Sequence, residues 1–332
     1  MRKFPIVQAK GSHYEVGVAI GKTMNGAIKR VLSKSRVIFQ KDFSIRLQRS
    51  KLFQKHTQKY FPQYIDELRG IAEGAKVSFD ELFLSNNREV ADFDPFLLDP
   101  NHCTILGIPS KGGYLLGHNE DWDITSLSHI YVLDSVTAGT RIFGLNYANT
   151  LIGCSVACNE YGIVQAVNEL SQQDESEGVP KNFIARALLD CKTLEDTEKI
   201  MKIIPRASGF NHVLSQGDQL WNIESIAKEY VIEKCKLQKY VHTNHYLSEF
   251  RRVDKGNLES ERRYAKVKGE LGNVNSVEDI KGLLSDHADP RICREGTIGS
   301  VIFDIPNKVA HIAYGQPTSG AYVEYSLEHV VR

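Results

Sequence analysis

Apolar residues in the first third of the chain recur every three or four positions, the spacing of one face of a helix. Clear stretches run from Tyr14 to Phe39 and from Pro62 to Ala75. Ser78-Phe79-Asp80-Glu81 adds the Ser-x-x-Glu pattern that is typical of a helix start. The pattern predicts a largely helical segment from Gly11 to about Asp92.

The pattern changes near residue 100, after a proline-containing junction at 94–100. Short apolar runs now alternate with turn residues, first at Cys103 to Ile108 and Tyr114 to Gly117, and again at Ile130 to Val136 and Ile142 to Tyr147. Pairs of short runs joined by turns predict antiparallel hairpins.

Helical spacing returns in four places, at 181–191, 194–203, 259–270 and 277–285. These stretches stand between groups of strands rather than after every strand, which favours antiparallel sheets covered by helices over a doubly wound parallel sheet. A length of 332 residues suits two domains or one large two-layer sandwich.

Charge and motifs exclude several functional classes. Lys plus Arg and Asp plus Glu both number 41, so no basic surface for a nucleic acid or an anionic membrane is expected. No apolar run of signal-peptide or membrane-spanning length is present, which predicts a cytoplasmic protein without membrane insertion. The sequence also lacks the G-x-S-x-G, P-loop, G-x-G-x-x-G and H-E-x-x-H motifs.

Cys103 stands out among the six cysteines because it begins the first strand after the helical segment. If the chain reverses at 110–113, the polar residues Asn119 to Asp121 return close to it. A carboxylate and an amide would then neighbour the thiol, although a solvated acidic loop explains the same pattern. A dyad with His102 is disfavoured, because adjacent strand residues point to opposite faces.

Two further polar clusters are candidate sites. In His242-Thr243-Asn244-His245, the histidines can bind a metal if Asp286 or His287 joins them, or Asn244 can donate to an oxyanion, or the segment is a polar loop. The cluster from Asp286 to Thr297 leads into an apolar strand, where an arginine can bind a substrate carboxylate or hold an active-site carboxylate, although surface charge explains the same pattern.

Together these clusters resemble the penicillin acyltransferase family, acyl-CoA:6-aminopenicillanic acid acyltransferase and its relatives, among the N-terminal nucleophile hydrolases. The similarity covers nearly the whole chain and depends on the order and spacing of its motifs. The motifs are Asn101-His102-Cys103-Thr104, Gly117-His118-Asn119-Glu120-Asp121-Trp122, His242-Thr243-Asn244-His245, the cluster from Asp286 to Arg294, and the strand from Thr297 to Asp304 with Ala313-Tyr314-Gly315-Gln316-Pro317.

The resemblance implies an αββα sandwich of two antiparallel sheets between helical layers. It also implies a precursor that cuts itself between His102 and Cys103. The small helical subunit (1–102) and the catalytic core (103–332) would stay associated, and a homo-oligomer is compatible with the family. No cofactor and no metal are implied.

The resemblance also assigns roles to individual residues. Cys103 is the nucleophile, Asp121 supports it and Asn244 contributes to the oxyanion hole. Further substrate-binding or supporting positions are Thr104, Asn119, Arg294 and Thr297. One residue departs from the fungal enzyme, which has glycine where this chain has His102, and glycine adopts a strained backbone more easily.

The function predicted on this basis is a self-processing cysteine amidohydrolase or acyltransferase. It would act on a small-molecule acyl amide through a thioester on Cys103, with the new α-amine as general base. Three alternatives stay open: an acyl-CoA-dependent transferase to an amine such as a β-lactam nucleus, a metal-dependent hydrolase using His242 and His245, and a non-catalytic binding protein. The sequence does not rank the substrates.

Overall fold

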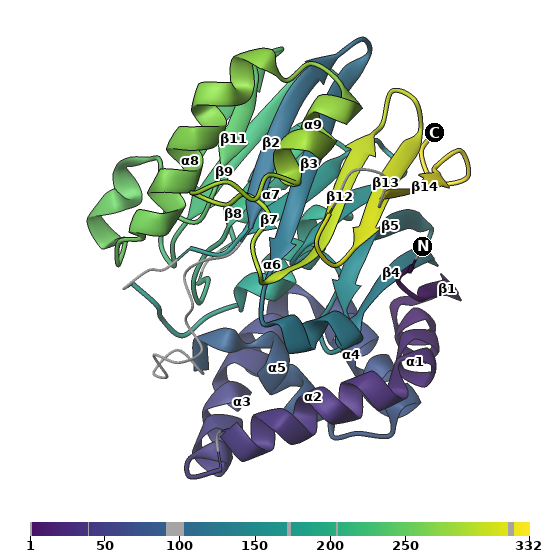
Figure 1. Cartoon of the computed structure of the whole chain (residues 1–332). Coiled ribbons are helices and arrows are strands. Elements are labelled where there is room, and N and C mark those ends of the chain that lie inside the picture. Colours follow the sequence, from purple (N-terminus) through teal and green to yellow (C-terminus); the bar gives the residue numbers. More distant parts are fainter. Residues whose placement is uncertain (1, 39, 91–102, 171–173, 204, 318–321) are drawn as a thin grey trace.

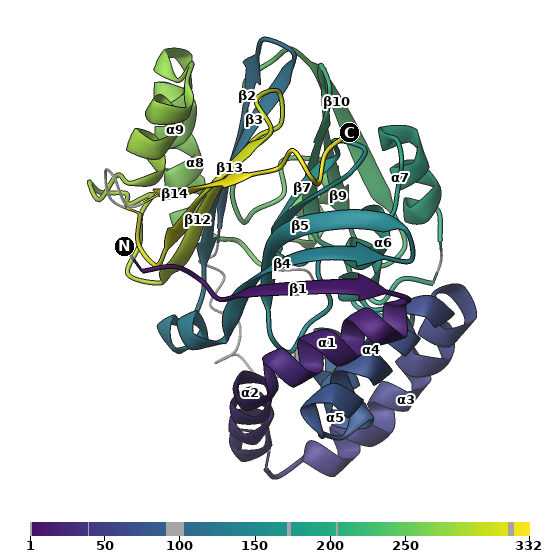
Figure 2. The ribbon, with the colours of Figure 1, turned by 90° about the vertical axis from the view of Figure 1, so that its right-hand side faces the viewer.

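Two β-sheets lie face to face and helices cover their outer faces, as Figures 1 and 2 show. The computed structural model describes residues 2–38, 40–90, 103–170, 174–203, 205–317 and 322–332. In this part of the chain, the larger sheet has eight strands in the order β1-β4-β5-β6-β7-β8-β9-β10, and the smaller has six in the order β11-β2-β3-β12-β13-β14. The αββα sandwich expected from the sequence is confirmed.

The eight-stranded sheet is antiparallel except at one edge, where β1 pairs in parallel with β4. Strand β1 comes from the N-terminal segment and the other seven come from the part of the chain after Cys103. The strands are β1 (Ile6–Gly11), β4 (Ile130–Thr137), β5 (Thr140–Tyr147), β6 (Val156–Asn159), β7 (Val164–Asn168), β8 (Asn211–Gln216), β9 (Gln219–Ser225) and β10 (Tyr230–Lys236).

The six-stranded sheet is antiparallel throughout. Its centre is the hairpin predicted after Cys103, with β12 paired to the second strand of that hairpin. The strands are β2 (Thr104–Ser110), β3 (Gly113–Asp121), β11 (Tyr240–His242), β12 (Thr297–Asp304), β13 (Val309–Tyr314) and β14 (Tyr322–Ser326).

In the described part of the chain, seven helices lie on the side of the larger sheet, where α2, α3 and α5 pack outside α1 and α4, and two helices lie on the smaller sheet (Figure 2). Apolar side chains fill the space between the sheets and the space between each sheet and its helices, so the molecule has three main cores. On the larger sheet lie α1 (His13–Thr23), α2 (Asn25–Ile38), α3 (Phe43–Tyr60), α4 (Pro62–Ala75), α5 (Phe79–Asn86), α6 (Lys181–Leu188) and α7 (Leu194–Met201), and on the smaller lie α8 (Leu258–Glu270) and α9 (Val277–Leu284). Short 3₁₀ helices are found at Arg88–Val90, Ile124–His129, Glu249–Val253 and Leu271–Asn273.

Helices α1 and α4 pack unusually closely, through glycines on both. A Cβ atom built on Gly17 or Gly21 would lie 2.1 or 2.2 Å from a backbone oxygen of α4. A Cβ on Gly70 or Gly74 would lie 2.1 or 2.3 Å from a backbone oxygen of α1. No side chain larger than hydrogen fits at these four positions unless the helices move apart.

The secondary structure differs from the predicted pattern in two places. The helical stretch from Tyr14 to Phe39 is divided at Met24 into α1 and α2, and Ile6–Gly11 forms a strand that the helical pattern of this segment did not predict. The junction at 94–100 and His102 lie outside the described residues.

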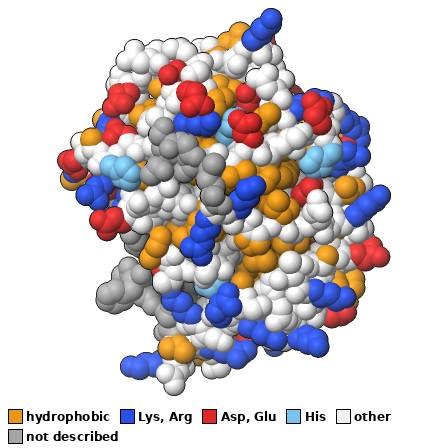
Figure 3. Space-filling model, turned by 45° about the vertical axis from the view of Figure 1, so that its right-hand side comes forward, with side chains coloured by type: hydrophobic (Ala, Val, Ile, Leu, Met, Phe, Trp, Pro, Cys, Tyr) orange, Lys and Arg blue, Asp and Glu red, His pale blue; other side chains and the backbone are white. Residues whose placement is uncertain are grey.

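The surface shown in Figure 3 carries basic and acidic side chains around a central area of apolar ones. Both charge signs are present on this face, in line with the equal numbers of acidic and basic residues in the chain. Among the described helices, none is both long enough and apolar enough to cross a membrane.

Candidate active site

Cys103 lies directly before β2, at the end of the β2–β3 hairpin where Thr104 faces Asn119 across the ladder. Its side chain is buried, with 4% of its surface exposed. Its backbone φ is +24°, in the left-handed region that non-glycine residues rarely adopt. The hairpin therefore brings the polar end of β3 to Cys103, as predicted, and the backbone at Cys103 is strained.

On the side facing the other sheet, the Cys103 sulfur lies beside two polar residues of β3. A ring nitrogen of His118, a carboxylate oxygen of Glu120 and this sulfur are all within 4.8 Å of one another. His118 Nε2 lies 2.9 Å from Glu120 Oε2, and Tyr147 and Ser155 of the larger sheet also donate to this carboxylate. Glu120 is thus held from both sheets.

Asp121 points to the opposite face of β3 from Glu120, because strand residues alternate. Thr297 Oγ1 donates to Asp121 Oδ1 at 2.5 Å, and the backbone N–H of Asp121 donates to the Cys103 sulfur. Burial raises the pKa of the Asp121 carboxyl to about 6, against the lowering effect of Arg263 and Thr297. Asp121 is therefore mostly ionised at neutral pH and contacts Cys103 through its backbone.

Arg263 of α8 connects Cys103 to the other candidate residues. Its Nη1 donates to Cys103 O at 2.9 Å and to Thr104 Oγ1 at 2.8 Å, and its Nη2 donates to Asn244 Oδ1 at 2.9 Å. Arg263 is fully buried, and burial lowers its pKa to about 10, which still leaves it charged at neutral pH. One guanidinium thus fixes the start of β2 and the amide of Asn244 relative to each other.

Asn244 is oriented so that its amide can donate. Its backbone N–H donates to Ser260 Oγ at 2.6 Å, and its Nδ2 donates to Glu169 O at 3.1 Å. A side-chain amide has two N–H bonds, and Oδ1 is already occupied by Arg263. Within the described residues, one Nδ2 hydrogen is used and the second is available to an oxyanion.

The thiol of Cys103 is protonated in this environment. Burial raises its pKa well above the ordinary value, and the charges of Glu120 and Asp121 raise it further. The Asp121 N–H and Arg263 lower it, but by less. Nucleophilic attack by Cys103 therefore requires a base that removes the thiol proton.

The supporting residues expected from the sequence lie around this centre in different roles. Thr104 accepts from Arg263, and Thr297 both donates to Asp121 and accepts from the Arg294 backbone N–H at 2.8 Å. Arg294 is half-buried, and its charge lowers the pKa of Asp121. Asn119 faces α9, where its Nδ2 donates to Leu284 O and Ile292 O, at 2.8 and 3.1 Å. These contacts anchor the segment after α9.

Sequence reasoning missed Arg263, and it placed His118 and Glu120 in the polar motif near Cys103 without giving either a role. Successive residues of a strand point to opposite faces, so His118 and Glu120 share the face opposite to that of Asp121. This alternation could be seen in the sequence. Arg263 gave no comparable signal, because an arginine in a helix rich in charged residues looks like a solvated surface position.

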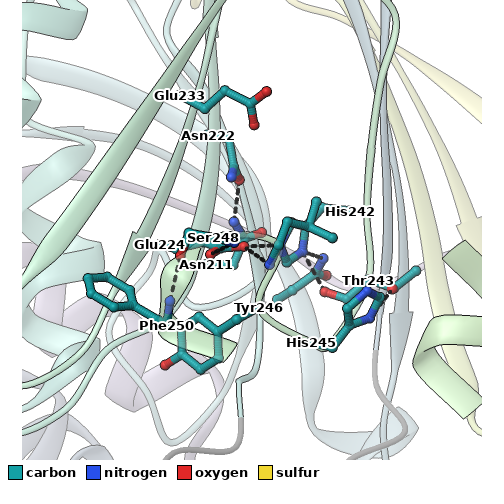
Figure 4. Close-up of polar contacts among 12 residues, drawn as sticks. Asn211, Asn222, Glu224, Glu233, His242, Thr243, His245, Tyr246, Ser248 and Phe250 are labelled. Atoms are coloured by element: carbon teal, nitrogen blue, oxygen red, sulfur yellow. Dashed lines mark hydrogen bonds and ion pairs between the residues drawn. The ribbon is translucent and has the colours of Figure 1, made fainter. Parts of the chain in front are cut away.

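The structure does not support the metal site at His242 and His245. His242 Nε2 lies 2.9 Å from Glu224 Oε1, and its Nδ1 lies 2.5 Å from Thr243 O and 3.0 Å from Asn168 Nδ2. His245 hydrogen-bonds with Ser260, and Figure 4 shows the His242 ring near Glu224 and the His245 ring near Thr243. Asp286 pairs with Lys266 at 2.6 Å. In the described part of the chain, neither histidine belongs to a set of three convergent donor atoms from His, Cys, Asp or Glu.

Solved structures with a similar backbone include two amide hydrolases. One is the N-acylethanolamine-hydrolyzing acid amidase ortholog of Caenorhabditis elegans, with a TM-score of 0.45 and 16% identity over 60% of this chain and 92% of that one. The other is the conjugated bile acid hydrolase of Clostridium perfringens, with a TM-score of 0.48 and 10% identity over 68% of this chain and 93% of that one.

Curated relatives and a family model match the sequence. The β-alanyl-dopamine/carcinine hydrolase of Drosophila melanogaster is 30% identical over 224 residues, which are 60% of this chain and little more than half (57%) of the fly protein. The 40 kDa form of acyl-coenzyme A:6-aminopenicillanic-acid-acyltransferase of Emericella nidulans is 22% identical over 94% of this chain and 93% of its own length. The model of the acyl-coenzyme A:6-aminopenicillanic acid acyl-transferase family matches residues 109–319, which include Asp121, Asn244 and Arg263. The chain belongs to this family.

Proposed function

We propose that this protein is a self-processing cysteine enzyme that breaks or transfers the amide bond of a small-molecule acyl amide through a thioester on Cys103. Membership of the family supports an amide hydrolase or an acyltransferase. The observation that carries the finer proposal is the position of Cys103 at the start of β2. There its backbone is strained, its sulfur accepts from the Asp121 backbone N–H, and its carbonyl accepts from Arg263.

Self-cleavage accounts for the strain at Cys103. A positive φ at a residue with a side chain raises the energy of the uncut chain by about 1–3 kcal/mol. Cutting the bond between His102 and Cys103 frees the Cys103 nitrogen and releases that strain. Arg263 holds the Cys103 carbonyl throughout, so the new N-terminus stays in the site.

The cut also creates the base that acts on external substrates. A free α-amine has an ordinary pKa of about 7.7–8.0, which suits proton removal from the thiol near neutral pH. The thiolate then attacks the substrate carbonyl, and Asn244 Nδ2 donates to the oxyanion. Loss of one such donor typically lowers the rate by about 10²–10³.

Hydrolysis of β-alanyl amides is the first activity to test. The fly relative, whose name describes a hydrolase of β-alanyl-dopamine and carcinine, has 30% identity, compared with 22% for the fungal acyltransferase. In the proposed reaction, water releases the acyl group from Cys103. An amine in place of water gives acyl transfer from the same intermediate.

The two segments made by the cut are held together by several buried contacts. Strand β1 of the first segment completes the sheet beside β4 of the second. Glu67 of α4 pairs with Arg186 of α6 at 3.0 Å, with both side chains buried. These contacts support a processed enzyme in which residues 1–102 and 103–332 remain associated.

The test is the intact mass of the purified chain combined with an amide hydrolysis assay. The wild type is expected to give two fragments split before Cys103, and Cys103→Ala is expected to stay whole and inactive. Cys235→Ala is the matched control, since it removes another buried thiol, on β10, and should be cut and active like the wild type.

Two results would contradict this proposal. A wild type that stays uncut yet hydrolyses amides would remove the N-terminal mechanism. Stoichiometric zinc in the active protein, with loss of activity on chelation, would favour the metal-dependent alternative.

A further inference from the structure

The uncut precursor lacks the free α-amine that is proposed to act as the base in the processed enzyme. Before the cut, the nitrogen of Cys103 is part of a peptide bond and cannot act as a base. The Cys103 thiol nevertheless has a raised pKa, because it is buried beside Glu120 and Asp121. Self-cleavage through this thiol therefore needs another group to take the proton.

His118 is the group placed to do so. Its side chain is completely buried, and a ring nitrogen lies within 4.8 Å of the Cys103 sulfur. One ring nitrogen, Nε2, lies 2.9 Å from Glu120 Oε2, and the other, Nδ1, has no hydrogen-bond partner among the described residues. The imidazole ring is thus next to the thiol, and no hydrogen bond from the described residues occupies its Nδ1, which leaves that nitrogen able to take up a proton.

The hydrogen bonds of Glu120 determine which nitrogen has the lone pair. Tyr147 and Ser155 both donate to this carboxylate, and burial keeps Tyr147 protonated by raising its pKa well above the ordinary value. Glu120 thus accepts from two hydroxyl groups, and its Oε2 is also the acceptor that faces His118 Nε2. Nε2 therefore carries the hydrogen and Nδ1 is the free base.

We infer that His118, held in this tautomer by Glu120, is the catalytic base that activates Cys103 for cleavage of the precursor. This inference rests on the proposed self-cleavage and adds the group that starts it. The arrangement is a thiol, an imidazole and an orienting carboxylate, with all three members on the β2–β3 hairpin and its entry.

During cleavage, His118 takes a proton from the thiol and later returns it to the Cys103 nitrogen. The S–H bond of Cys103 breaks, its proton moves to His118 Nδ1, and the sulfur forms a bond to the carbonyl carbon of His102. As the C–N bond to Cys103 breaks, His118 returns the proton to the Cys103 nitrogen, which becomes a free amine beside a thioester. Water then hydrolyses the thioester, which leaves a carboxyl group on His102 and the thiol on Cys103.

The test follows self-cleavage of the full chain during cell-free synthesis, by denaturing gel and intact mass. His118→Gln keeps an amide that can donate to Glu120 but has no basic nitrogen, and it should cut about 10²–10⁴ times more slowly than the wild type. Glu120→Gln, which removes the charge that fixes the tautomer, should slow the cut by at least about tenfold. His212→Gln is the matched control, because His212 is also buried and also has an unpartnered Nδ1, and it should cut at the wild-type rate.

The pH dependence of cleavage separates a base from a merely structural residue. With His118 present, the rate should level off at alkaline pH. In His118→Gln it should keep rising by about tenfold per pH unit, because hydroxide must remove the thiol proton. The other ionisable groups near position 118 are the same in the wild type and in His118→Gln. They are Cys103, Glu120, Asp121, Tyr147, Cys154 and Arg263.

The outcomes distinguish this inference from the proposed function. If the wild type is never cut, self-cleavage fails and the inference fails with it. If the wild type is cut and His118→Gln is cut within threefold as fast, the inference alone is wrong. It is also wrong if His118→Gln is slow with an unchanged pH profile and a lower melting temperature than His212→Gln.

Discussion

Arg263 organises the site although it belongs to a helix on the outside of the smaller sheet. A buried guanidinium has five N–H donors in a fixed plane, and here it bonds to two backbone or side-chain oxygens at the start of β2 and to Asn244. Lysine presents a single point of charge and does not reproduce this geometry. The relative position of Cys103, the proposed nucleophile, and Asn244, the proposed oxyanion donor, therefore depends on one side chain.

Asp121 makes the stability of the chain depend on pH. Its folded pKa is about 6, whereas an unfolded aspartate has a pKa of about 3.9. The folded state thus binds the proton more tightly. The favourable contribution is complete below about pH 4 and is lost as the pH rises through about 6, a change of about two pKa units or about 3 kcal/mol.

The measurement is the urea unfolding free energy of uncut Cys103→Ala, alone and combined with Asp121→Asn, at about pH 4 and 7. Between these values, the parent should lose up to about 3 kcal/mol more than the Asp121→Asn protein, because asparagine does not titrate. An equal loss in both proteins would show that Asp121 has an ordinary pKa in the fold.

At the residue scale, the sequence predicted the members of the site that belong to short contiguous motifs. Cys103 and Asp121 are joined by a hairpin whose turn residues are recognisable, so their proximity followed from the chain reversal. Arg263 contacts Cys103 across 160 positions of sequence. The packing of α8 on the smaller sheet places Arg263 next to Cys103, and no local sequence pattern predicts that packing.

At the element scale, α1 packs directly on α4. The four glycines let the two helix backbones come into direct contact, and α1 leads from the strand β1 into the helical layer. The position of this layer on the larger sheet therefore depends on the absence of side chains at the crossing.

Gly21→Ala should destabilise the chain by about 1–3 kcal/mol or more, because the new methyl group would lie 2.2 Å from Ile71 O. The matched control is Gly282→Ala on α9, where no atom lies within 4 Å of the added Cβ. The control should be stabilised by about 0.5–1 kcal/mol, since alanine favours a helix. Urea unfolding of both in uncut Cys103→Ala makes the comparison, and equal effects would mean that α1 and α4 are not in close contact.

Most elements could be predicted because their periodicity is local. Strand β1 could not, since its six residues precede a helical pattern and its partner, β4, is more than a hundred residues away. The division of the first helical stretch at Met24 was hidden for a similar reason: the apolar spacing continues across the break, and the direction of each helix is set by what it packs against.

At the scale of the whole molecule, the buried pair of Glu67 and Arg186 connects the two segments. Burial acts to raise the pKa of Glu67, but Arg186 and His13 outweigh it and hold this pKa below its ordinary value. Arg186 also donates to Asp190 at 3.0 Å. The charges of this pair compensate each other, so neither can be removed without leaving the other buried and unpaired.

Arg186→Met should weaken the association of the processed segments by about 3–5 kcal/mol. Size-exclusion chromatography at increasing urea measures this, and the segments of the variant should separate at lower urea than those of the wild type. Arg69→Met is the control, because Arg69 pairs with Asp66 on the exposed face of α4 and the pair lies within one segment. If both variants separate at the same urea concentration, the buried pair does not hold the segments together.

The parallel pairing of β1 with β4 has a consequence for the order of folding and cutting. In the uncut chain, β1 finds β4 as part of the same molecule, at an effective concentration set by the intervening chain. After the cut, the same pairing is an encounter between two molecules. Recovery of denatured processed enzyme should therefore slow in proportion to dilution, whereas recovery of Cys103→Ala should not depend on concentration. The peptide bond between His102 and Cys103 would then help the chain to fold once, before the proposed self-cleavage breaks it.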